Sequence, residues 1–344
     1  QPLLARCCRG RLSMPSAACG GGKRIVASLL VAASLVPPEG GSAASMEALG
    51  KARALKPPIA SATSGGEFEA VDFWDTNEAL LAQAWKEYGR ADASVYELDE
   101  RFLHPPLRDA LAGVGGGERS EASLLEQGLI VETEAKGVYA LRVFTDEFIQ
   151  QLLAELDYLS NSGIPMRRPN GMNRYGCILS DLGFGRLLDS LRRRVVVPLA
   201  QFLFHDRVGL QDAVDGYGFT VRYRKGEDLE LAEHADASVV TLNLCLGVAF
   251  EGGELYFKGV RSFRGPSKED TPMVSITHKP GVGLLHLGQH VHGASPLLDG
   301  DRINLVLWCF GEHEVVRVVP HDEPDRTTLE QRWGPESKQK AGEL

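Results

Sequence analysis

The chain has 344 residues, of which 43% are hydrophobic and 24% charged, and its formal net charge is −9. This composition is typical of a globular protein and excludes disordered, collagen-like and disulfide-scaffold chains, since six cysteines are too few for the last class. The acidic balance provides no general field that attracts nucleic acid, so we expect no nucleic-acid partner.

Residues 1–66 differ from the rest of the chain in charge, because they carry eight basic and two acidic residues. Lys23 and Arg24 precede an apolar run at 25–36, and prolines and small residues follow up to position 45. A basic stretch, a short apolar stretch and small residues form the layout of an export signal, and twelve residues are too few to cross a membrane.

We therefore expect a leader peptide followed by a linker at 46–66, and no transmembrane anchor in the mature chain. A start at Met14 would make the leader a secretory signal for the endoplasmic reticulum, whereas the acid-free, Arg-bearing stretch before it is typical of a plastid transit sequence. A disordered, Ala-rich tail is the alternative interpretation.

The rest of the chain divides into three parts. Residues 67–116 are expected to form a helical region of unassigned role, which ends in the glycine-rich stretch 113–117. Residues 117–315 form the predicted main domain, and residues 316–344 a polar tail.

The main domain begins with a strand at 137–144 and two helices. Thr145 is the predicted N-cap of the first helix, whose apolar face carries positions 149, 152, 153, 156 and 159. A second helix is expected over residues 185–204.

From residue 218 the hydrophobic period changes to two. Short runs rich in β-branched residues lie at 218–223, 238–246, 254–257, 273–277, 282–287 and 302–310. Six strands with no helical pattern between them predict an antiparallel sandwich or jelly roll. Cys177, Cys245 and Cys309, which remain after the leader cysteines are removed, are expected to be free thiols.

The segment His234-Ala235-Asp236 places two potential metal ligands at i and i+2. In an extended backbone both side chains point to one face, so one cation can contact both. His286, His290 and His292 each offer a third ligand, and strand parity leaves all three open. Two histidines and one carboxylate suit Fe(II) with three open positions, and zinc in a hydrolase is the alternative. A surface histidine in an acidic stretch is the plainer interpretation of His234.

Arg302 begins a strand in which it shares one face with Asn304 and Val306. If that face lines a barrel, the guanidinium needs a carboxylate partner, because an unpaired buried cation is costly. A planar guanidinium fits the distal carboxylate of a dicarboxylic ligand such as 2-oxoglutarate. An exposed turn arginine beside Asp299 and Asp301 is the alternative.

These elements occur in one ordered pattern, Tyr223…Gly226…His234-x-Asp236…Gly252-Gly253-Glu254…His292-x3-Pro296-x3-Gly300-x-Arg302. Over residues 138–311 the pattern resembles the Fe(II)/2-oxoglutarate dioxygenases of the prolyl 4-hydroxylase type. The resemblance selects His292 over the other two histidines, because Pro296, Gly300 and Arg302 follow it at +4, +8 and +10. Two departures are Arg302, where collagen-type members have lysine, and Tyr223, which lies 11 residues before His234 and further than the family pattern.

The resemblance implies an α+β fold, in which N-terminal helices pack against a double-stranded β-helix, or jelly roll, within a dioxygenase domain at 117–315. It implies the following site: His234, Asp236 and His292 as metal ligands, Arg302, Tyr223 and Asn243 as cosubstrate-binding residues, Tyr256 and Asn304 facing the pocket, and no catalytic residue beyond the metal site.

The implied activity is hydroxylation of a C–H bond, with a peptidyl proline as the family's favoured acceptor and release of succinate and CO2. Fe(II), 2-oxoglutarate and O2 would take part, and L-ascorbate would act as reductant. The substrate would be a protein or a small molecule. The alternatives are a catalytically inactive jelly-roll binding protein and a metal hydrolase or cupin-type enzyme. The complete ligand set argues against the first and Arg302 against the second.

Overall fold

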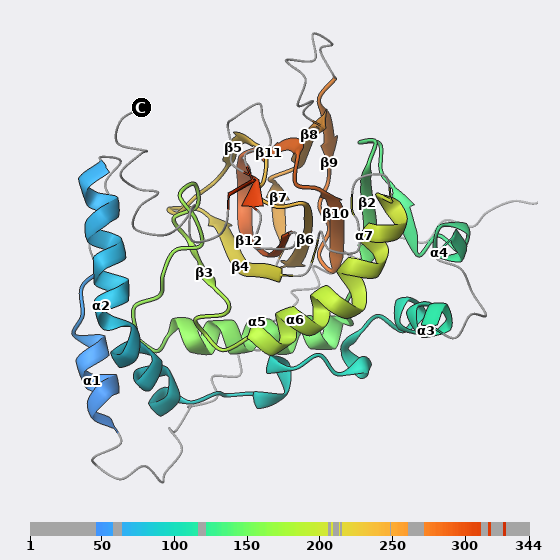
Figure 1. Cartoon of the computed structure of the whole chain (residues 1–344). Helices are drawn as coiled ribbons and strands as arrows, with labels where there is room; N and C mark the ends of the chain where they lie inside the picture. Colours follow the sequence, from blue (N-terminus) through green and yellow to red (C-terminus); the bar gives the residue numbers. More distant parts are fainter. Residues whose placement is uncertain are drawn as a thin grey trace, which may run out of the picture. The chain divides into compact units, whose positions relative to one another are not determined.

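Two antiparallel sheets form the centre of the fold, and helices cover the outer face of the larger sheet (Figure 1). The computed structural model describes residues 46–57, 64–115, 122–205, 208, 213, 215–247, 249–260, 272–310, 316–317 and 326–327. All of these lie in one unit, residues 42–344. The predicted leader at 1–45 lies outside the described residues, as does the tail at 316–344 apart from the short pair β13 (Val316–Arg317) and β14 (Arg326–Thr327).

The larger sheet has the strand order β1-β2-β10-β6-β12-β4-β3, and β7 pairs with β12. Its strands are β1 (Ile130–Glu132), β2 (Val138–Arg142), β3 (Gly176–Ile178), β4 (Asp215–Arg224), β6 (Val240–Gly247), β7 (Phe250–Gly252), β10 (Val282–Leu287) and β12 (Leu297–Phe310). The smaller sheet, in the order β5-β11-β8-β9, contains β5 (Leu231–His234), β8 (Leu255–Val260), β9 (Val274–Ile276) and β11 (His290–Ala294). The sheets share an apolar interior, so the predicted jelly-roll core with packed helices is confirmed.

The larger sheet is buried on both faces, as β6 illustrates. All eight residues of β6 are buried. Leu242, Leu244 and Leu246 belong to the core shared with the helices. Because successive side chains of a strand point to opposite faces, Thr241 and Asn243 face the smaller sheet instead. The interior between the two sheets therefore receives the polar residues of β6.

Three helical segments cover the outer face of the larger sheet, namely α5 (Asp146–Ser160), α6 (Gly185–Leu191) and α7 (Val197–Leu203) (Figure 1). Thr145 caps α5 as predicted, since its side chain accepts a hydrogen bond from the Phe148 N–H. A π-helical turn at Arg192–Val196 joins α6 to α7 within the predicted helix 185–204. Gly218 in β4 has no side chain where Leu188 of α6 packs, which brings this helix close to the sheet.

The N-terminal segment contains α1 (Glu47–Arg53), α2 (Ser64–Tyr88), α3 (Pro105–Gly115), α4 (Ala122–Glu126) and the 3₁₀ turns η2 (Ala93–Tyr96) and η3 (Glu100–Phe102). The structure differs from the linker predicted at 46–66, because α1 buries Ala48, Leu49 and Ala52. Alanine favours helices as well as linkers, so composition did not distinguish them. The main hydrophobic core also continues across the boundary expected at 116, since it contains both Val95 and Phe148.

None of the described helices combines the length and the apolar character that a membrane crossing requires.

Candidate metal centre

The structure brings His234, Asp236 and His292 together between the two sheets. His234 ends β5, and His292 lies directly opposite it in the neighbouring strand β11. The Oδ1 atom of Asp236 lies 3.3 Å from His234 Nε2 and 3.8 Å from His292 Nε2. One potential ligand atom from each residue therefore lies within 4.8 Å of the others, close enough for one cation to contact all three.

Hydrogen bonds orient each of these side chains. The Nδ1 atom of His234 lies 2.9 Å from the Ala232 carbonyl oxygen, and that of His292 lies 2.8 Å from the His290 carbonyl oxygen. Because a carbonyl only accepts, both Nδ1 atoms carry the proton and both Nε2 lone pairs face the site. Thr241 Oγ1 donates to Asp236 Oδ2 at 2.7 Å, which leaves Oδ1 for a cation.

The protonation states of His292 and Asp236 suit a divalent cation. Burial lowers the pKa of His292 to about 3, so its ring is neutral. Burial opposes the charge on Asp236, but His292 and His234 outweigh burial and hold the pKa of that carboxyl below its usual range. Burial also opposes the charge on the His234 ring, but the adjacent Asp236 carboxylate, an acceptor, outweighs burial and raises the pKa of His234 above its ordinary value. Two imidazoles and one carboxylate fit Fe(II).

His286 and His290 are also buried, but neither belongs to this group. The Nδ1 atom of His286 lies 2.9 Å from the Leu287 carbonyl oxygen, and His290 Nε2 lies 3.1 Å from the Lys136 carbonyl oxygen. The pairing of β11 with β8 shifts register between positions 290 and 292, which separates two side chains of equal parity. Because His290 and His292 have the same parity in the strand, parity alone could not show which of them joins the group.

Arg302 in β12 is 1% exposed, and its guanidinium contacts Asn304, Gly253 and His278 as well as the thiol of Cys245. Its Nε donates to Asn304 Oδ1 at 3.1 Å, Nη1 donates to the carbonyl oxygen of Gly253, and Nη2 lies 3.3 Å from His278 Nδ1. The alternative of an exposed turn arginine is therefore excluded.

The guanidinium of Arg302 has no carboxylate partner among the described residues. Its Cζ lies 5.5 Å from the centroid of the Tyr223 ring and 5.7 Å from that of Phe250. Burial lowers the pKa of Arg302, but a guanidinium still keeps its proton in a protein. A buried cation held only by neutral groups is costly, and an anionic ligand would offset this cost.

One cavity between the sheets is lined by the three metal-ligand candidates together with Arg302, Tyr223, Asn243 and Asn304. The hydroxyl of Tyr223 accepts a hydrogen bond from Asn173 Nδ2 at 3.1 Å. Tyr256, predicted to face the pocket, does not line it. Leu255 and Phe257 are buried on the inner face of β8, so the alternation of the strand turns Tyr256 to the other face.

Sequence reasoning did not identify three residues of this region, namely Asn173, His278 and Trp308. Trp308 lines the cavity, and its Nε1 donor has no acceptor among the residues that the structure describes. It shares the parity of Arg302 in β12, so strand alternation contained the signal for it. His278 follows β9 and Asn173 lies in a loop, where no periodic pattern indicates direction.

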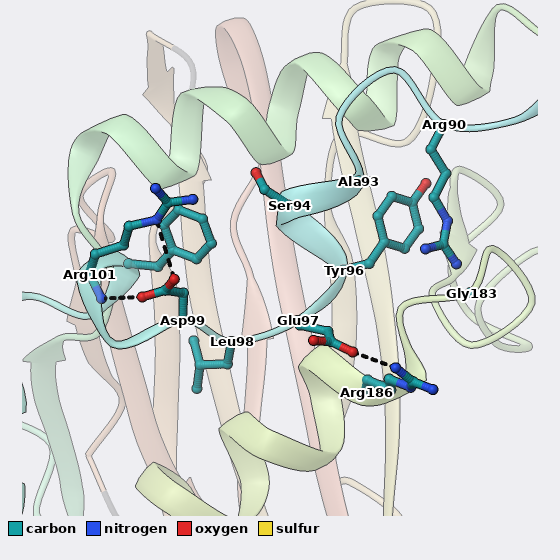
Figure 2. Close-up of a pocket in the computed structure, with 11 residues that line it drawn as sticks. Arg90, Ala93, Ser94, Tyr96, Glu97, Leu98, Asp99, Arg101, Gly183 and Arg186 are labelled. Atoms are coloured by element: carbon teal, nitrogen blue, oxygen red, sulfur yellow. Dashed lines mark hydrogen bonds and ion pairs between the residues drawn. The ribbon is translucent and has the colours of Figure 1, made fainter.

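A second hollow lies on the helical side, between the segment 90–102 and the start of α6 (Figure 2). Its charged groups already have partners. Arg186 pairs with Glu97 at 2.5 Å, and Arg101 Nε lies 3.5 Å from Asp99. Arg90 lies over the ring of Tyr96, 3.8 Å from its centroid. The candidate metal ligands lie in the other cavity.

Comparison with known proteins agrees with this geometry. Residues 85–209 match the OGFOD2-like domain family. The chain is 40% identical to 2-oxoglutarate and iron-dependent oxygenase domain-containing protein 2 of Mus musculus, over 71% of this chain and 68% of that protein. The human protein of the same name is 42% identical, over 67% and 64% of the two chains.

In Arabidopsis thaliana, the protein ICU11 with the same domain is 36% identical over 64% of this chain and 55% of its own length. The chain thus spans somewhat less than two thirds of several of its curated relatives. The match to the mouse protein covers 68% of that protein, which is more than two thirds. It confirms the family resemblance seen in the sequence. The chain belongs to the family of 2-oxoglutarate and iron-dependent oxygenase domain-containing proteins.

Proposed function

We propose that this protein is a dioxygenase that uses Fe(II), 2-oxoglutarate and O2 to hydroxylate a C–H bond, releasing succinate and CO2. The observation that carries the proposal is one cavity that combines the group His234, Asp236 and His292 with a buried Arg302 lacking a carboxylate partner among the described residues. His234, Asp236 and His292 would hold the iron. When bound, iron and 2-oxoglutarate supply the oxidising chemistry.

The protein supplies binding and orientation. Arg302 binds the distal carboxylate of 2-oxoglutarate, because a guanidinium can form two parallel hydrogen bonds with a carboxylate. Tyr223 accepts a hydrogen bond from Asn173, so its own hydroxyl proton remains available for a ligand oxygen. Asn243 lies next in the network, where its Oδ1 accepts from Asn304 Nδ2 at 2.6 Å.

Apolar side chains also limit the contact of the cavity with water. Phe219, Val306 and Trp308 form an apolar wall, and Asp236 is 3% exposed. Low polarity around the ligands strengthens each electrostatic contact in the site. The Trp308 Nε1–H has no partner in the part of the chain that the structure describes, and it is therefore available to a hydrogen-bond acceptor of the substrate.

Two finer parts of the proposal rest on the family resemblance. These are a peptidyl proline as the acceptor of the hydroxyl group and L-ascorbate as the reductant that restores Fe(II).

Succinate formation tests the activity. Iron-loaded protein with 2-oxoglutarate should form succinate, and ascorbate should prolong turnover. Folded, iron-loaded protein that forms no succinate would contradict the proposal and favour a binding protein or a hydrolase. In a lysate, mass spectrometry should then detect products that gain one oxygen atom, which would identify the substrate.

A further inference from the structure

His278 contacts two residues that line the cavity, Arg302 and Asn304, and is not itself one of the lining residues. It follows β9, is 2% exposed, and its ring contacts both Arg302 and Asn304. Its Nε2 lies 2.8 Å from the Val282 carbonyl oxygen, and its Nδ1 lies 3.3 Å from both Arg302 Nη2 and Asn304 Nδ2. A ring with a partner on each nitrogen has a defined orientation.

The partners determine the position of the proton on this ring. The Val282 carbonyl only accepts hydrogen bonds, so His278 Nε2 carries a proton and donates it. Arg302 only donates, so His278 Nδ1 carries a lone pair and accepts. Burial and the charge of Arg302 lower the pKa of His278 to about 3, so the ring is neutral.

The same reasoning orients the two amides. Arg302 Nε donates to Asn304 Oδ1, which places the amide nitrogen of Asn304 on the other side. That nitrogen donates to Asn243 Oδ1 at 2.6 Å and faces His278 Nδ1. The direction of each hydrogen bond described here is therefore set by Arg302, which only donates, and by the Val282 carbonyl, which only accepts.

We propose that His278 is a positioning residue that orients Arg302 without cancelling its positive charge. The proposal rests on the proposed function, since it concerns how Arg302 is prepared for 2-oxoglutarate. An aspartate at this position would also accept the hydrogen bond, but it would form an ion pair with Arg302 and compete with the ligand's carboxylate. A neutral imidazole provides the acceptor and leaves the charge available for the ligand.

The pair His278→Asn and His278→Asp tests this role, because the two side chains have the same shape and differ in charge. Both place an oxygen close to the position of Nδ1. We expect the dissociation constant for 2-oxoglutarate, measured by calorimetry on Fe(II)-loaded protein without dioxygen, to stay within about threefold in His278→Asn and to rise about tenfold or more in His278→Asp. The thermal midpoint of His278→Asp should not fall below that of His278→Asn.

Equal affinities of the two variants for 2-oxoglutarate would overturn the proposal. It would also be overturned if, in both variants, the affinity fell in parallel with the thermal midpoint, because a loss of stability would then explain the effect. If neither variant folds, the ¹⁵N chemical shifts of the His278 ring in the wild-type protein decide. We expect a protonated Nε2 and an unprotonated Nδ1 before and after addition of 2-oxoglutarate, and an imidazolium in either state would contradict the assignment. Wild-type protein that does not bind 2-oxoglutarate would instead refute the proposed function.

Discussion

At the scale of single residues, His290 and His292 show how little separates a metal-ligand candidate from a structural histidine. Both are buried in β11, two positions apart. His292 donates through Nδ1 and directs Nε2 toward Asp236, whereas His290 Nε2 is occupied by the Lys136 carbonyl oxygen. The direction of the free lone pair, and not burial or residue type, distinguishes them.

This difference predicts opposite effects of two substitutions. His292→Ala should abolish iron binding, because it removes one of three protein ligands, while His290→Ala should retain it. Iron content after anaerobic loading and desalting measures both. Loss of iron in His290→Ala with retention in His292→Ala would move the third ligand to His290.

Arg302 allows a second prediction at this scale. Arg302→Ala should raise the KM for 2-oxoglutarate by about 10- to 100-fold, because a hydrogen bond to a charged group contributes about 1.5–3 kcal/mol. Arg302→Lys keeps the charge but loses the planar fork, and should give a smaller increase. Iron binding should stay unchanged in both, and an unchanged KM in Arg302→Ala would remove this residue from the cosubstrate site.

At the scale of elements, Glu155 joins α5 to the turn that follows α2. This carboxylate is 1% exposed and accepts hydrogen bonds from the Asp92 N–H at 2.7 Å and from the Tyr96 hydroxyl at 2.7 Å. Burial and the neighbouring Glu155 raise the pKa of Tyr96, which keeps its hydroxyl protonated as a donor. The N-terminal helical region is thus attached to the main domain by a buried charge that depends on its donors.

Removing one donor should destabilise this attachment. Tyr96→Phe should lower the free energy of unfolding by about 1–3 kcal/mol, the cost of leaving a buried charge with one hydrogen bond fewer. Tyr175→Phe is the matched control, since Tyr175 is 38% exposed, and it should change little. Urea unfolding measures both variants, and equal stabilities would show that the bond to Glu155 contributes nothing net.

The order of elements could be predicted well where the pattern is local. Thr145 as N-cap, the helix after it and the six β runs follow from short-range periodicity and capping chemistry. The register shift in β11 could not be predicted, because it depends on the pairing with β8 across a long stretch of chain. The direction of the Tyr256 side chain, away from the cavity, could not be predicted either, because it too depends on how β8 packs in the folded protein.

At the scale of the whole molecule, buried neutral histidines make stability depend on pH. Burial lowers the pKa of His278 to about 3 and that of His286 to about 4, whereas the unfolded chain has the ordinary value of 6.5. Below pH 6.5 the unfolded state binds protons that the folded state does not. The contribution of these two histidines to the free energy of unfolding is therefore complete above this pH and decreases as the pH falls toward 4.

Each of these histidines should contribute about 1.4 kcal/mol per pH unit in that window. Urea unfolding of the metal-free protein should show a free energy that falls from pH 6 to pH 5, and His278→Asn should show a shallower slope. A free energy that does not change over this range would mean that the two rings are protonated in the folded protein.

The sequence by itself determined the class of fold, the spacing of His234, Asp236 and Arg302, and the family to which they belong. These properties depend on the order and spacing of residues along the chain, which can be read from the sequence directly. The tertiary structure decided which buried polar groups have partners: among the described residues Arg302 has no carboxylate partner and the Trp308 Nε1–H has no acceptor, while His278 contacts Arg302. The hydrogen-bond and ion-pair partners of a buried group depend on strand pairing and on packing between distant segments, so they are determined only when the chain folds.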